Sequence, residues 1–290
     1  MNILSAKNSL IAALTLIALP FAFSGCKTSS DPFATGDFQV DSVKYSYTDK
    51  VMLTLTEPVE DQDSTLIQVD MDIDWPKSTG KNIVSVNAVR DWLQEHLSSL
   101  NQYKKIYEGN IDDANALVKF YGDSYKEAFE QSNEFPAPAL TYELSFKKNF
   151  ENSKCVTFMY ALDVYLGGAH GSRTDYGITF RKSDGKIMRD FLTLADVTDD
   201  GLNKLIKKGL MAYWGLSDEE MLYEYCWENS VSKYYAAQPH TPPCFVKDGI
   251  LFCYQEYEIA AYAAGAPSFV VPYPEIKKYL TPSAQALISD

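Results

Sequence analysis

A strict alternation of apolar and polar residues is the sequence feature that most constrains the fold. In residues 64–75, apolar side chains at positions 69, 71, 73 and 75 alternate with Asp70, Asp72 and Asp74. Successive side chains of a β-strand point to opposite faces of the sheet. The segment therefore predicts a strand with one buried face and one solvated, acidic face.

A calcium-binding loop is the alternative interpretation of these three aspartates. Such a loop requires Gly at its sixth position and Glu at its twelfth. Trp75 and Lys81 occupy those positions. The motif therefore fails, and the strand interpretation is favoured.

The same alternation predicts four further strands, at residues 43–57, 140–146, 156–164 and 174–180. Between them, apolar residues spaced three or four apart predict two helices, the first capped by Asn87 and the second beginning near Ile111. Strands and helices that are joined mainly by hairpins indicate an α+β fold rather than a doubly wound parallel sheet. We expect antiparallel sheets with helices packed on one face, in two closely associated sub-domains.

Shorter elements are predicted in the C-terminal part. The apolar spacing from Leu202 to Leu210 predicts a helix, and Ser217 with Glu220 has the pattern of a capping box for another. A strand is expected at 268–273 and a short helix at 275–280. We predict an N-terminal α+β domain at 37–182 and a C-terminal α+β domain at 183–290.

The first residues predict the compartment. Lys7 precedes an apolar run from Leu10 to Phe23, and Ser-Gly-Cys follows. This is the pattern of a cleaved signal peptide, and its end resembles the lipobox of bacterial lipoproteins. The resemblance implies a signal peptide at 1–25, diacylation of Cys26 and a flexible tether at 26–36. A plain secretory signal is the alternative. Either reading places the chain in the cell envelope, and lipidation anchors it to the membrane on the periplasmic or extracellular side.

The charge balance bears on the class of partner. The chain has 26 basic and 39 acidic residues, a net charge of −13. Removing residues 1–25 takes away Lys7 and no acidic residue, so the mature chain has 25 − 39 = −14. This balance argues against nucleic acid, which needs a basic surface. It favours a cationic partner, although solubility alone also accounts for such a charge.

Four cysteines follow Cys26. A two-residue turn at Asp248-Gly249 would place Cys244 opposite Cys253, at a position where the side chains of two strands approach closely. We expect a disulfide between these two residues, with Cys226–Cys244 as the rival pairing. The fourth, Cys155, is expected to be a buried thiol.

No catalytic or metal-binding motif stands out. His96, His170 and His240 are widely separated, and the chain lacks the usual nucleophile and phosphate-binding motifs. His170 lies in the glycine-rich segment YLGGAHGS, where it could pair with Ser172 as a catalytic residue. We favour a structural role, in which the ring bridges a tight corner. We expect no cofactor, no metal and no enzymatic activity.

Two segments carry a family resemblance. The corner at 165–171 and the closing segment at 257–273 together resemble the extracytoplasmic module of the lysozyme-sensing anti-sigma factor RsiV, which is also found in the non-catalytic N-terminal part of the peptidoglycan deacetylase PdaC. The N-terminal domain expected here is the PdaC-like part. The matching residues that we take as binding candidates are Tyr165, Gly167, Gly168, His170, Gly171, Tyr257, Glu258, Tyr262, Gly265, Pro272 and Tyr273.

The resemblance implies a binding function. The chain shows no anti-sigma segment and no deacetylase domain, so we expect a stand-alone, lipid-anchored binding module. By resemblance, its partner is a cationic, lysozyme-like protein. The alternatives are a module that binds peptidoglycan or its glycan fragments and a hydrolase with an unrecognised site.

The lipid anchor gives the first testable prediction. Cys26→Ser should abolish acylation, because serine has no thiol to carry the diacylglycerol. We expect the wild-type protein in the membrane fraction with the mass of the lipid added, and the variant released from it, as measured by fractionation and intact-mass spectrometry. Cys155→Ser serves as the control and should stay anchored. A wild-type mature chain without acyl groups would contradict the anchor.

Overall fold

The structure is a computed structural model, which describes residues 38–52, 64–77, 82–99, 105–131, 137–193 and 200–288. The predicted signal peptide, Cys26 and the predicted tether all lie outside the described residues. None of the described helices combines the length and apolar character needed to cross a membrane.

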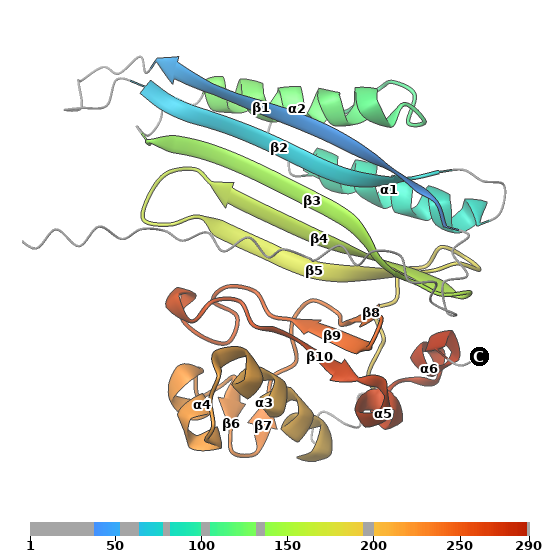
Figure 1. Ribbon diagram of the computed structural model, residues 1–290, viewed down its shortest axis with the longest axis vertical. Helices are drawn as coiled ribbons and strands as arrows, with labels where there is room; N and C mark the ends of the chain where they lie inside the picture. The colour runs from blue at the N-terminus through green and yellow to red at the C-terminus, as the bar shows by residue number, and fades with distance from the viewer. Residues whose placement is uncertain are drawn as a thin grey trace, which may run out of the picture. The chain divides into compact units, whose positions relative to one another are not determined.

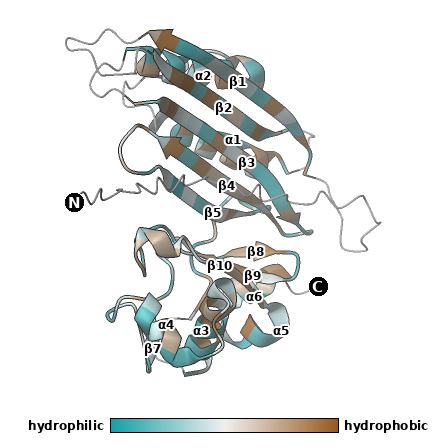
Figure 2. Cartoon of the chain, turned by 60° about the vertical axis from the view of Figure 1, so that its left-hand side comes forward, coloured by the Kyte–Doolittle hydropathy of each residue, from teal (hydrophilic) through white to brown (hydrophobic). Residues whose placement is uncertain are grey.

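A five-stranded sheet in the order β1-β2-β3-β4-β5 forms the N-terminal part (Figure 1). Its strands are β1 (Val40–Met52), β2 (Ser64–Pro76), β3 (Ala139–Glu151), β4 (Cys155–Tyr165) and β5 (Ser172–Arg181). The predicted alternation holds: Val69, Met71 and Ile73 are buried, whereas the intervening aspartates are partly exposed. Figure 2 shows the alternation as bands along the strands.

Three of the four pairs of neighbouring strands in this sheet are antiparallel, and the exception is the pair β2–β3, which is parallel. The connection between these two strands contains both helices of the N-terminal part, α1 (Ile83–Ser99) and α2 (Ala114–Glu130). A parallel pair needs such a crossover, because its strands run in the same direction. The fold class is therefore α+β, as predicted. The one parallel pair was not predicted, because the sequence led us to expect strands joined by hairpins, which are antiparallel.

The two helices cover one face of this sheet (Figure 1). Val89, Leu93 and Leu97 of α1 join Leu117 and Val118 of α2 in a cluster with the apolar side chains of the strands. The prediction that Asn87 caps α1 is wrong, because the helix begins four residues earlier, at Ile83. Packing of the first helical turn against the sheet, through buried Val86, decides that boundary.

The C-terminal part is built on a small sheet in the order β10-β9-β8. Its elements are α3 (Asp200–Trp214), α4 (Glu219–Tyr225), β6 (Val231–Ser232), β7 (Tyr235–Ala236), β8 (Cys244–Val246), β9 (Gly249–Cys253), η2 (Tyr262–Ala264), β10 (Ser268–Pro272), α5 (Tyr273–Ile276), η3 (Lys277–Tyr279) and α6 (Pro282–Ile288). The cap of α4 is Asp218, which accepts a hydrogen bond from the Glu220 N–H, and not the predicted Ser217.

The predicted register of the β8–β9 hairpin is wrong. Val246 pairs with Gly249, so the turn is Lys247-Asp248, one residue earlier than predicted. This shift places Leu251, not Cys253, opposite Cys244. All four described cysteines are buried, free thiols, so neither the Cys244–Cys253 bridge nor the rival Cys226–Cys244 bridge is present.

Two hydrophobic clusters organise the chain. The first gathers the five strands with α1 and α2, and the second gathers the C-terminal elements together with Cys155 of β4. The Thr157 and Thr179 hydroxyls hydrogen-bond to each other at 2.8 Å, and Thr179 accepts from the Phe245 N–H at 3.2 Å. All the described residues belong to one compact unit. The predicted domain division near residue 182 stays a prediction.

A buried carboxylate ties the start of β1 to the ends of β3 and β5. Glu151 accepts hydrogen bonds from Lys182 at 2.5 Å, from Lys148 at 3.0 Å and from the Phe38 N–H at 2.9 Å. The side chains of Glu151 and Lys182 are only 8% and 5% exposed. Loss of one partner from such a buried pair leaves the other charge uncompensated.

Glu151→Leu should therefore lower the free energy of unfolding by about 3–5 kcal/mol. Urea denaturation followed by tryptophan fluorescence measures this change. The control is Lys119→Ala, which removes the exposed ion pair with Asp123 and should cost less than about 1 kcal/mol. Equal effects of the two substitutions would show that Glu151 does not hold the strands together.

Candidate functional site

The glycine-rich corner connects β4 to β5 at one end of the large sheet. Gly167 and Gly168 have φ angles of 92° and 90°, in the left-handed region that favours glycine. A Cβ atom at Gly171 would lie 2.9 Å from the Val164 carbonyl oxygen. The Tyr165 hydroxyl donates to the Gly168 carbonyl at 3.0 Å. The corner is therefore a tight turn that glycines make sterically accessible.

His170 joins the corner to the closing segment, 87 residues away. Its Nδ1 lies 2.7 Å from the Gly171 carbonyl oxygen, and its Nε2 lies 3.1 Å from the Tyr257 hydroxyl. Its ring stacks on Tyr262, with ring centroids 3.8 Å apart. The structure thus brings the two segments of the resemblance into direct contact through one exposed histidine.

Tyr257 is held outward by an unusual backbone. Its φ angle is 63°, which is uncommon for a residue with a Cβ atom, and its side chain is 50% exposed. The Tyr257 and Tyr262 rings lie 5.7 Å apart. Strained, exposed residues of this kind gather at functional sites. We name His170, Tyr257 and Tyr262 the corner triad.

Hydrogen bonds to the edge strand β5 fix the backbone beneath the corner triad. The Gln255 side chain accepts from the Asp175 N–H at 3.2 Å and donates to the Asp175 carbonyl at 2.8 Å. Glu256 accepts from the Arg173 N–H at 3.2 Å. The side-chain amide thus replaces a missing neighbouring strand. These three bonds satisfy the edge that β5 would otherwise expose.

Glu258 supports the same segment from inside. Its side chain is 3% exposed, and it accepts hydrogen bonds from the Gln255 N–H at 2.7 Å and the His240 N–H at 2.5 Å. Gly265 ends η2 with a φ angle of 79°. Tyr273 donates to the Val246 carbonyl at 2.7 Å. Pro272 ends β10 of the small sheet and Tyr273 begins α5, so these two residues lie on other elements than the corner triad.

Three acidic side chains form a row across the outer face of the large sheet. Asp70 of β2 is opposite Glu143 of β3, Glu143 is opposite Asp163 of β4, and Asp163 is opposite Arg173 of β5. We name Asp70, Glu143 and Asp163 the acidic row. Sequence alternation placed each on a strand face, but only the pairing of distant strands aligns them.

The acidic row carries more negative charge than its neighbours balance. Burial, followed by the charges of Asp163 and Asp70, raises the pKa of Glu143. Burial also raises the pKa of Asp163, against the opposing effect of Arg173, which lies 2.9 Å from Asp163. The pKa of Tyr262 is raised by burial and by the charges of Glu256, Tyr257 and Asp163. Asp163 therefore links the acidic row electrostatically to Tyr262 of the corner triad.

The next row of the sheet is balanced. Asp72 forms ion pairs with Lys44 at 3.0 Å and with Lys147, and Lys147 also lies 3.1 Å from Asp74. The two lysines lower the pKa of Asp72, although burial opposes them. Lys44 and Lys147 are thus paired with Asp72 and Asp74, and not with the acidic row.

The other two histidines lie apart from this site. His96 stacks on Trp92, with centroids 4.4 Å apart, and burial lowers its pKa. It is a packed residue, as predicted. His240 exposes 87% of its side chain, as expected for a loop residue. Among the residues that the structure describes, no group of three His, Cys, Asp or Glu side chains could hold a metal ion.

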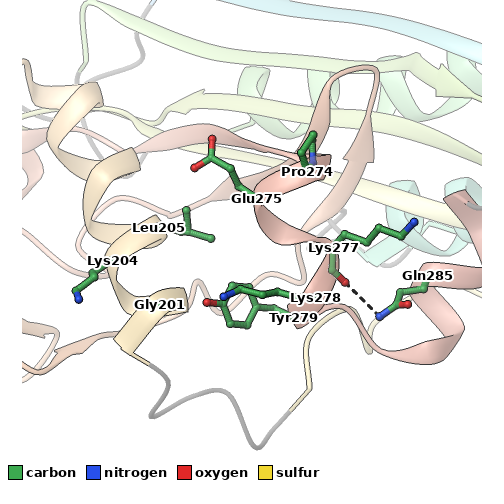
Figure 3. Close-up of a pocket in the computed structure, with 9 residues that line it drawn as sticks. All are labelled: Gly201, Lys204, Leu205, Pro274, Glu275, Lys277, Lys278, Tyr279 and Gln285. Carbon is green, nitrogen blue, oxygen red and sulfur yellow. Dashed lines mark hydrogen bonds between the residues drawn. The ribbon is translucent and has the colours of Figure 1, made fainter.

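A pocket of about 600 Å³ lies elsewhere, between α3 and the segment 274–285 (Figure 3). Its lining includes Lys204, Lys277 and Lys278 with Glu275. Glu275 pairs with Lys208 at 3.2 Å. None of the residues predicted from the sequence lines this pocket.

Comparisons with known proteins place the fold. Residues 227–274 match the family described as "Protein of unknown function (DUF3298)". A crystal structure of a DUF3298 family member from Bacteroides fragilis has 17% sequence identity and a TM-score of 0.60, covering 88% of this chain and 99% of that one. A DUF3298 family protein from Pseudomonas aeruginosa has 14% identity and a TM-score of 0.51, covering 84% and 96%. The search of curated proteins gave no match.

These comparisons show an α+β fold of the DUF3298 kind. The matched range 227–274 contains the closing segment, including Tyr257 and Tyr262, whereas the corner at 165–171 lies outside it. At identities of 17% and 14%, the similarity concerns the fold alone.

His170→Ala should lower the melting temperature, because it removes the stack on Tyr262 and the bond to Tyr257. Together these contacts are worth on the order of 1–2 kcal/mol. Differential scanning calorimetry measures the change, and His170→Phe is the control that keeps the stack and loses only the hydrogen bonds. Full stability combined with loss of binding or of turnover would contradict the structural role of His170.

Proposed function

We propose that this protein is a non-enzymatic envelope lipoprotein that binds a cationic protein on its acidic row and corner triad. By resemblance, the partner is lysozyme-like. The observation that carries the proposal is the alignment of Asp70, Glu143 and Asp163 beside the exposed Tyr257 and the partly exposed Tyr262. The resemblance supplies the type of partner, and the geometry supplies a surface whose charge suits it.

Without a bound partner, the acidic row lowers the stability of the folded chain. Like charges that face each other across neighbouring strands destabilise a sheet by roughly 0.2–1 kcal/mol for each pair. A cationic partner would relieve this repulsion when it binds. Departures from local rules are expected at functional sites. The row is therefore better explained as a binding surface than as a stabilising one.

The tyrosines of the corner triad add apolar contact area, which charged side chains alone do not provide. Opposite charges mainly speed association and confer specificity. Exposed aromatic side chains on a fixed backbone supply contact area at low cost in conformational entropy. The exposed Tyr257 meets this description, and the partly exposed Tyr262 adds to the contact area, since His170 and the bonds of Gln255 hold their segment in place.

The contacts of His170 support binding rather than hydrolysis. Its two ring nitrogens face the Gly171 carbonyl and the Tyr257 hydroxyl. A catalytic histidine would instead direct one nitrogen to a nucleophile and the other to an orienting carboxylate. The lipid on Cys26 would hold this surface in the envelope, where a muramidase is encountered.

The test is a calorimetric titration of the purified protein with hen egg-white lysozyme. We expect binding that weakens from 50 to 500 mM salt, because salt screens exposed charges. The double variant Asp70→Lys, Glu143→Lys should lower the affinity at least tenfold. Binding should also weaken on acidification, beginning above the usual carboxyl range, because Glu143 and Asp163 have raised pKa values.

The matched control is Asp91→Lys, Glu95→Lys, which changes the net charge equally at exposed positions of α1, on the other face of the sheet. It should leave the affinity within about twofold of wild type. Equal loss in both double variants would reduce the effect to overall charge. Absence of binding at low salt would refute lysozyme as the partner.

A further inference from the structure

Four aromatic side chains form a second surface at the ends of α3 and α4. Tyr213 and Trp214 are the last ring-bearing residues of α3, Tyr225 ends α4, and Trp227 follows two residues later. The Trp214 ring lies 5.7 Å from Tyr213 and 5.5 Å from Tyr225. We name these four residues the aromatic shelf.

The shelf faces solvent for a local reason. Cys226 is buried and extended, and it forms a β-bridge with Ala260. Neighbours of an inward-pointing extended residue point outward. Tyr225 and Trp227 are accordingly 46% and 41% exposed, and Tyr213 is 40% exposed.

Contacts with the segment 259–265 also hold the aromatic shelf in place. The Trp214 indole donates to the Ala264 carbonyl at 2.8 Å. The Tyr213 hydroxyl sits where a Cβ atom at Gly265 would lie only 2.8 Å from it, so glycine at 265 makes room for the ring. The Trp227 N–H donates to the Ile259 carbonyl at 2.9 Å. These contacts hold the Trp214 ring and the backbone of Trp227 in place, which lowers the entropic cost of binding a ligand.

The charged residues next to the aromatic shelf, which we call its rim, indicate what kind of ligand it could bind. Glu224 and Glu228 are exposed beside Tyr225 and Trp227. Carboxylates accept hydrogen bonds from hydroxyl groups and repel anions. Met221, one helical turn before Tyr225 and 43% exposed, adds an apolar contact. The surface suits a ligand with apolar ring faces and hydroxyl-bearing edges, without negative charge.

We propose that the aromatic shelf binds a neutral, β-linked oligosaccharide. Such a chain is a flat ribbon whose sugar rings present C–H faces to aromatic rings and hydroxyl groups to the carboxylates. Tyr and Trp side chains suit this ligand, because they combine an apolar ring face with a polar group that faces solvent. The site lies on other elements than the acidic row, and it contacts the segment 259–265, which carries Tyr262 of the corner triad.

The test is a calorimetric titration of the purified protein with the tetramer of N-acetylglucosamine. We expect binding that is the same at 50 and 500 mM salt. Tyr225→Ala and Trp227→Ala should each weaken it about five- to tenfold, with unchanged melting temperatures. The control is Tyr234→Ala, a ring that is 76% exposed near the other end of α3, which should leave the affinity unchanged.

Two further measurements separate the site from the lysozyme proposal. An oligomer of uronic acids should not bind, because the rim is acidic. The Tyr225→Ala and Trp227→Ala variants should keep wild-type affinity for lysozyme. The inference is overturned if the neutral tetramer does not bind, if the control ring matters as much as the shelf, or if the shelf variants lose lysozyme instead of the sugar.

Discussion

The structure depends on how the edge strand β5 is completed. A strand at the edge of a sheet exposes unpaired backbone groups. Here the Gln255 amide and the Glu256 carboxylate satisfy those of Asp175 and Arg173. Further along, Thr179 receives the N–H of Phe245. The C-terminal part is thereby fixed to the large sheet, and Tyr257 and Tyr262 are positioned as a consequence.

This junction links folding to recognition. The strand that is capped by Gln255 also carries Arg173, the basic end of the acidic row. The segment that does the capping carries Tyr257 and Tyr262, and its continuation anchors the aromatic shelf through Ala264. The corner triad and the aromatic shelf thus both depend on this one segment, whereas strand pairing aligns the acidic row. Separate substitutions can address each of them, because their side chains come from different elements.

The sequence predicted the elements whose signal is local and strong. The helix α2 begins at Ala114, close to the predicted Ile111, since Asp113 caps it and its apolar face is long. The predictions failed where packing competes with a local preference. Asp248-Gly249 is a favoured turn, yet the turn falls at Lys247-Asp248, because the pairing of β9 with β10 also constrains the register. That one-residue change in the turn moves the predicted partner of Cys244 by two positions.

By itself, the sequence determined which side of each strand is buried, because alternation is a property of neighbouring residues. It also marked the glycine corner and the closing tyrosines. Only the tertiary structure decided that Asp70, Glu143 and Asp163 face one another, and that His170 meets Tyr257. Register between distant strands and contacts across 87 residues depend on how whole elements pack, and no local pattern contains that information.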